Sequence, residues 1–118
     1  MLINFEMVSE NVNINYKVFG RRDGDVLIFP DKSVPNTTMM VVFKENAVII
    51  RRLGAVSMEQ SFVLGEQRTG FYKNDMGLEF EIRSFTTEMN VEENMIEIFY
   101  EHYLEDKWQS SNKLKILF

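Results

Sequence analysis

Apolar and polar residues alternate along most of this chain with a period of two, which is the pattern of half-buried β-strands. The clearest case is Leu78–Arg83, where every second residue is apolar and the others are charged. Val56–Leu64 alternates in the same way and places one polar group, Gln60, on an otherwise apolar face. The other predicted strands cover residues 12–18, with 2–8 as the first half of the same strand, and residues 26–29, 37–44, 47–52, 67–73, 94–105 and 113–118.

Turn signals separate these segments. The run Gly20–Asp25 contains an Asp-Gly pair and predicts a hairpin that joins residues 12–18 to the short apolar run Val26–Phe29. Pro30 then ends that run, because proline lacks a backbone donor, and residues 31–36 are expected to form a loop. Later hairpin turns are expected at Glu45-Asn46 and at Asn74–Gly77.

The segment Glu88–Asp106 is ambiguous on periodicity alone. A helical face is compatible with the spacing of its large apolar residues, which are Ile96, Phe99, Tyr100, Tyr103 and Leu104. A strand would instead place Ile96, Ile98, Tyr100, His102 and Leu104 on one face. We favour the strand because aromatic residues and isoleucine outweigh helix formers here, and residues 105–107 would then form a hairpin turn to the C-terminal strand.

The composition supports an all-β fold. The chain of 118 residues contains ten Phe, four Tyr, one Trp and eight Met, and 45% of its residues are hydrophobic. This length predicts a single domain over residues 1–118. About eight or nine short antiparallel strands with regular turns, and little helix, predict a barrel or a sandwich. A barrel of that size has an interior that is filled by side chains or holds one small ligand.

Charge and residue usage exclude several functions. The net charge of −5 argues against binding to nucleic acid, which needs clustered Lys and Arg. The chain has no cysteine, hence no disulfide or thiolate metal site, and no motif that predicts a metal or a cofactor. No signal peptide or apolar span is apparent, so we expect a cytoplasmic protein without a membrane partner.

The second half of the chain resembles a known bacterial family. The resemblance rests on the order of Arg52-x-Gly54, Met58, Phe62, Gly65, Tyr72, Gly77 and Tyr100-x-x-x-Leu104, followed by an apolar C-terminal strand. These features resemble the YwiB-like family of domains of unknown function. The resemblance implies a lipocalin-like β-barrel of the calycin superfamily and implies no catalytic residue. The chain departs from the family pattern at Asn74, where threonine is usual, and at Phe29-Pro30-Asp31, where Tyr-x-Glu is usual.

Five polar residues lie on faces that we predict to point into the barrel, and they are the candidate ligand-binding residues: Arg52, Gln60, Tyr72, Tyr100 and His102. Arg52 is suited to hold a carboxylate or phosphate in two hydrogen bonds, but it could equally pair with an internal carboxylate or extend to water. His102 is the only histidine. It is either a base inside the barrel with a shifted pKa or a core or rim residue whose ring nitrogens have hydrogen-bond partners in the protein. The amide and the two hydroxyls could orient a ligand or hydrogen-bond one another.

Two functions follow from this set. The first is a cytosolic barrel that binds a small, partly apolar or anionic ligand. The alternative is a non-enzymatic protein-interaction or homodimer module with a filled interior, so that the protein is a monomer or a homodimer. An enzyme ranks third, because the chain offers no convergent acid and base residues.

Overall fold

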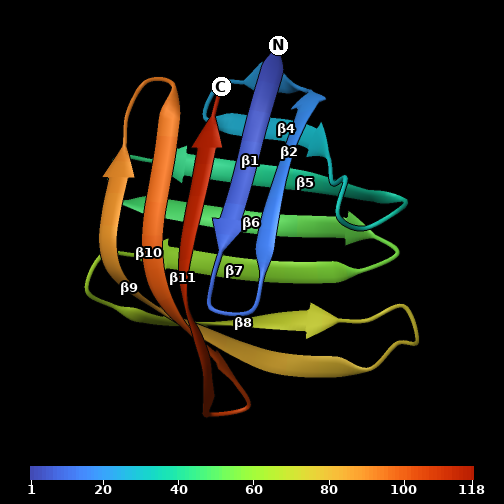
Figure 1. Ribbon diagram of the computed structural model, residues 1–118, viewed down its shortest axis with the longest axis vertical. Helices are drawn as coiled ribbons and strands as arrows, with labels where there is room; N and C mark the ends of the chain where they lie inside the picture. The colour runs from blue at the N-terminus through green and yellow to red at the C-terminus, as the bar shows by residue number, and fades with distance from the viewer.

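The computed structural model describes residues 1–118, which form eleven strands and no helix (Figure 1). The strands are β1 (Leu2–Val8), β2 (Asn13–Phe19), β3 (Arg21–Asp23), β4 (Val26–Pro30), β5 (Thr37–Lys44), β6 (Ala47–Gly54), β7 (Ser57–Val63), β8 (Gln67–Lys73), β9 (Glu79–Val91), β10 (Met95–Leu104) and β11 (Lys107–Leu117). They form one antiparallel sheet in the order β2-β1-β11-β10-β9-β8-β7-β6-β5-β4-β3. The fold is therefore all-β, as the alternation predicted.

The sheet curls into a nearly closed barrel, and Gly20 forms the corner at which its two edges meet. The chain runs from β2 through Gly20 directly into β3, so one bent segment pairs with β1 at one edge and with β4 at the other. A Cβ atom on Gly20 would lie 2.6 Å from Ile3 Cδ1 and 2.7 Å from the Ile28 carbonyl oxygen, so only glycine fits this approach. In Figure 1, β1, β2, β10 and β11 cross over β5 and β6, and buried residues of both groups of strands form one core cluster.

Apolar side chains on the inward face fill one end of the barrel. Phe5 stacks on Tyr16 with ring centroids 5.1 Å apart and packs against Phe29 at 6.2 Å. Phe62, which is fully buried, packs against Tyr100 at 4.7 Å. These contacts join strands from both groups. Closing that end, the rings of Phe43 and Phe118 lie 5.3 Å apart, and the guanidinium of Arg22 lies over both of them.

Most of the ambiguous segment Glu88–Asp106 forms the strand β10, as we favoured, and its first four residues complete β9. In β10 the inward residues Ile96, Ile98 and Tyr100 are buried, and each outward neighbour is more exposed. Glu105 and Asp106 form the expected turn to β11, and both have positive φ angles, of 48° and 70°. That is the backbone of a two-residue hairpin turn whose twist matches that of the flanking strands.

The predicted hairpin between residues 12–18 and 26–29 is wrong. Residues 2–8 form a separate strand, β1, and it is β1 that pairs with β2. Arg21–Asp23, which we expected in the turn, forms β3 and pairs with β4 instead. These two strands account for most of the difference between the predicted eight or nine strands and the eleven observed. Residues 21–23 are all charged and all exposed, so periodicity gave no sign that they form a strand with a different partner.

Three residues that we placed on apolar faces are less buried than their pattern suggested. Leu64 and Leu78 are 54% and 56% exposed, because both lie in turns beyond the ends of their strands. Phe80 faces inward with Ile82 but lies toward the end of the barrel, where it is half-buried and outside the core cluster. The predicted facing is correct, whereas the predicted depth is not.

The structure has no helix long and apolar enough to cross a membrane. It also places no group of three or more His, Asp or Glu side chains where they could hold a metal ion.

Candidate functional site

A cavity of ≈ 260 Å³ occupies the end of the barrel opposite the packed aromatic rings. On β10 and β11 the inward residues change from apolar to polar toward this end: Ile98 is followed by Tyr100 on β10, and Leu114 is preceded by Asn112 on β11. All five candidate residues predicted from the sequence line this cavity. The other lining residues are Met7, Ser9, Val12, Met58, Ile82, Ser110 and Asn112.

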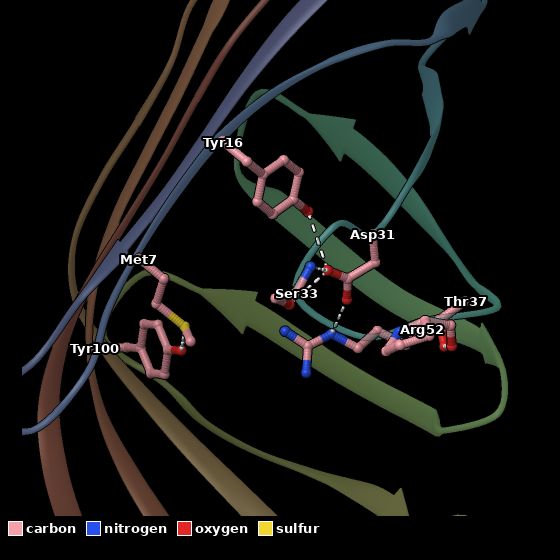
Figure 2. A network of polar contacts seen from close by, with 8 residues as sticks. Met7, Tyr16, Asp31, Ser33, Thr37, Arg52 and Tyr100 are labelled. Atoms are coloured by element: carbon pink, nitrogen blue, oxygen red, sulfur yellow. Dashed lines mark hydrogen bonds and ion pairs between the residues drawn. The ribbon is translucent and has the colours of Figure 1, made fainter.

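Arg52 supplies the only cationic side chain of the cavity. It follows Val48 and Ile50 on the inward face of β6, and its side chain is only 14% exposed. Its Nε lies 3.1 Å from Oδ2 of Asp31, whose side chain is fully buried (Figure 2). The predicted alternative in which Arg52 pairs with an internal carboxylate is thus correct, and the carboxylate comes from the segment that follows β4.

Asp31 is fixed in place by three donors to its other oxygen. Oδ1 accepts hydrogen bonds from the Ser33 backbone N–H at 2.8 Å, from the Ser33 hydroxyl at 2.5 Å and from the Tyr16 hydroxyl at 3.3 Å (Figure 2). Burial and the charge of Asp31 both raise the pKa of Tyr16, so this hydroxyl stays protonated and can donate. Tyr16 is on β2, so its hydrogen bond also crosses the seam where β2 and β4 approach without a ladder.

The guanidinium of Arg52 keeps its terminal nitrogens free. Nε and Asp31 Oδ2 form a close ion pair, although the Nε–H is not aligned for a hydrogen bond. The two terminal nitrogens donate to no protein group, and in Figure 2 they point away from Asp31 toward the side of the barrel that carries Tyr100 and Met7. Asp31 therefore orients the guanidinium through one edge and leaves the other edge to the cavity.

Tyr100 and Gln60 form the floor of the cavity. The Tyr100 hydroxyl donates weakly to Met7 Sδ at 3.6 Å, and Gln60 Nε2 donates to Ser84 Oγ at 3.4 Å. Burial raises the pKa of Tyr100, and the nearby amides of Asn112 and Gln60 and the charge of Arg52 only partly oppose this effect. Neither amide makes a well-aligned hydrogen bond with the hydroxyl. These polar groups therefore have weak protein partners.

His102 and Asn112 line the wall formed by β10 and β11. His102 lies opposite Ser110 in the strand register, and Asn112 lies opposite Tyr100. His102 Nδ1 and Asn112 Oδ1 are buried without a hydrogen-bond partner. Burial lowers the pKa of His102 below its ordinary value of 6.5, so the imidazole is neutral at pH 7.

Tyr72 is the fifth candidate residue, and it is half-buried on β8 between Met58 and Phe80 in the register. Its hydroxyl makes no hydrogen bond within the protein. The structure thus brings all five candidates to one cavity, but they do not form a closed network in which each satisfies another.

Sequence reasoning missed Asp31, Ser110 and Asn112. Asp31 was placed in a loop, and residues in loops are usually exposed. Ser110 and Asn112 could have been found, because the alternation of Leu114 and Ile116 continues backward through them. We began that strand at residue 113, whereas β11 begins at Lys107.

The fold and the site define an antiparallel, nearly closed β-barrel that is packed at one end and has, at the other, an internal cavity lined by both apolar and polar side chains. It is consistent with the calycin-like barrel that the family resemblance implies. The chain belongs to the family described as domain of unknown function DUF1934, whose sequence model matches residues 4–116.

A solved structure supports the same fold. The chain is similar to the crystal structure of the ywiB protein from Bacillus subtilis, with a TM-score of 0.74 and 20% sequence identity. The alignment covers 98% of this chain and 87% of that one. The resemblance to the YwiB-like family is therefore confirmed. No curated protein matches the chain.

Proposed function

We propose that this barrel binds a small, partly apolar carboxylate in its internal cavity, with the carboxylate held by Arg52. The observation that carries the proposal is the state of the guanidinium, which is largely buried at the cavity and has two terminal nitrogens without protein partners. A planar guanidinium fits a carboxylate through two parallel N–H···O bonds.

The surroundings of Arg52 suit a ligand with a charged head and an apolar body. Met7, Met58 and Ile82 give the cavity apolar walls, and Ser9 and Val12 lie in the β1–β2 turn beside it. A volume of ≈ 260 Å³ is slightly below the usual range for drug-sized ligands, which begins at roughly 300 Å³. A short-chain acid therefore matches this space better than a long fatty acid.

The filled-interior alternative accounts less well for the polar groups. In a filled barrel the inward polar atoms would satisfy one another, because a buried polar atom without a partner costs about 1 to 3 kcal/mol. The terminal nitrogens of Arg52, a residue that lines the cavity, donate to no protein group and are not enclosed, unlike His102 Nδ1 and Asn112 Oδ1, which are buried without a partner. Accessible donors of this kind are expected where a ligand or water completes the hydrogen bonding.

The proposal can be tested by thermal stability against short-chain acids. Butyrate, pentanoate and hexanoate should raise the melting temperature, whereas the corresponding alcohols should not. A ligand present at 100 times its Kd adds about 2.7 kcal/mol to the free energy of unfolding. Inorganic phosphate tests whether the site prefers a different anion.

Two charge-neutral double variants give matched comparisons. Arg52→Gln with Asp31→Asn removes the internal ion pair, and Arg51→Gln with Glu59→Gln removes an exposed pair with a 2.7 Å separation on the opposite face. The first variant should lose the shift caused by the acids, and the second should keep it. The proposal fails if no anion stabilises the natural protein, or if the internal double variant responds like the natural protein.

A further inference from the structure

The wall opposite the ion pair carries a second set of polar atoms that has no partner in the protein. In both His102 and Asn112 one polar atom, Nδ1 or Oδ1, is buried and unpaired. The other polar atom of each side chain, Nε2 or Nδ2, makes no well-aligned hydrogen bond in the protein, and both residues line the cavity. A ligand in the cavity would therefore meet Nε2 of His102 and Nδ2 of Asn112.

Both of these atoms are hydrogen-bond donors. A neutral imidazole has one N–H and one bare nitrogen. Orphaned buried N–H groups are rarer than buried acceptors that lack a partner, so the proton belongs on Nε2 rather than on the enclosed Nδ1. Nδ2 of Asn112 carries two N–H bonds and lies near the Tyr100 hydroxyl without a well-aligned hydrogen bond to it, so at least one N–H is free for a ligand. The hydroxyl of Ser110, opposite His102 in the register, can also donate.

The charges around the cavity set the kind of acceptor that fits these donors. Arg52 is the only cation among the lining residues, and Asp31 already pairs with it. A second carboxylate at the His102 wall would be buried without a counter-charge, which is costly. An uncharged oxygen would need no counter-charge and could accept from two or three donors.

We propose, building on the function proposed above, that the ligand is an oxo carboxylate, with its carboxylate on Arg52 and a carbonyl oxygen on Nε2 of His102 and Nδ2 of Asn112. The carbonyl distinguishes this class from plain short-chain acids of the same length and from dicarboxylates. The site thus recognises two acceptor groups of different charge at opposite walls, with the apolar side chains around the carbon chain between them.

The experiment compares acids that differ only by a carbonyl group, by calorimetric titration of the full chain. The pairs are pyruvate and propionate, acetoacetate and butyrate, and levulinate and pentanoate, in which the carbonyl moves away from the carboxylate one carbon at a time. At least one oxo acid should bind about three- to tenfold more tightly than its partner, the effect expected of one neutral hydrogen bond. Glutarate, a dicarboxylate, should bind more weakly than that oxo acid.

Two variants test whether His102 and Asn112 cause the preference for the oxo acid. Asn112→Leu keeps the size of the side chain and removes its donors, and His102→Leu does the same for the imidazole. Each should reduce the ratio of the oxo-acid affinity to the plain-acid affinity. Ser111→Ala, at the outward position beside Asn112, is the control and should change neither value.

Each outcome separates this inference from the function it rests on. Equal binding of oxo and plain acids, or tightest binding of glutarate, overturns the carbonyl site but keeps the carboxylate site. A preference that survives in both leucine variants also overturns it, because the carbonyl then binds elsewhere. If no acid of either kind binds, the proposed function itself fails.

Discussion

Replacing Arg52 by glutamine should destabilise the protein far more than the same change at its neighbour Arg51. Arg52 lies inside the barrel against the fully buried Asp31, whereas Arg51 lies outside in a pair with Glu59 whose side chains are 42% and 37% exposed. Removing one partner of a buried ion pair leaves an uncompensated charge and costs about 3 to 5 kcal/mol. Losing an exposed pair costs about 0 to 1 kcal/mol.

The contacts of Asp31 narrow the loss of stability that is expected for Arg52→Gln. Oδ1 of Asp31 keeps its three hydrogen bonds in the variant, which continue to stabilise the carboxylate. We therefore expect a loss near the lower limit, about 3 kcal/mol. Adding Asp31→Asn should recover most of it, because the double variant buries no unpaired charge and the asparagine oxygen can still accept the Ser33 and Tyr16 hydrogen bonds.

Urea denaturation without ligand measures these differences. A small domain has a slope of about 1 to 3 kcal/mol/M in urea, so Arg52→Gln should lower the midpoint by roughly 1 to 3 M. Arg51→Gln should shift the midpoint by less than about 1 M. The reasoning is refuted if the two single variants lose equal stability, or if adding Asp31→Asn makes the Arg52 variant less stable still.

Three further predictions follow from burial, backbone contacts and titration. Phe62→Ala should cost about 3 to 5 kcal/mol and the half-buried Phe80→Ala about 1 to 2 kcal/mol in the same urea assay; equal losses would contradict the assigned depths. Gly70→Ala should prevent or strongly weaken folding, because its Cβ would lie 2.0 Å from a backbone carbonyl oxygen of β7. At Gly24 an added Cβ meets open space, so Gly24→Ala should cost only about 1 kcal/mol, for the φ angle of 59°. Thermal melts followed by circular dichroism compare the two variants. Burial lowers the pKa of His102 in the folded state, so as the pH falls below 6.5 the unfolded chain takes up a proton before the folded chain does. The free energy of unfolding should therefore decrease as the pH falls from about 7 to about 5. His102→Gln should flatten this dependence in thermal melts over the same range.

The direction of each candidate side chain could be predicted from the sequence. Gln60, Tyr100 and His102 were assigned inward because successive residues of a strand point to opposite faces, and that rule depends only on the local backbone. The same rule placed Arg52 beside Val48 and Ile50 without knowledge of the strand's neighbours. The all-β class followed for the same reason, since alternation and residue type are local properties of the chain.

The depth of each inward residue and the groups that it contacts depend on how the whole sheet closes. Phe80 and Phe62 have the same alternation, but one lies near an open end and the other in the packed interior. The bend at Gly20 and the pairing of Arg52 with Asp31 both arise when distant segments close the barrel. Strand periodicity determines which way a side chain points. Its depth and its partners depend on the curvature and closure of the sheet, to which all the strands of the chain contribute.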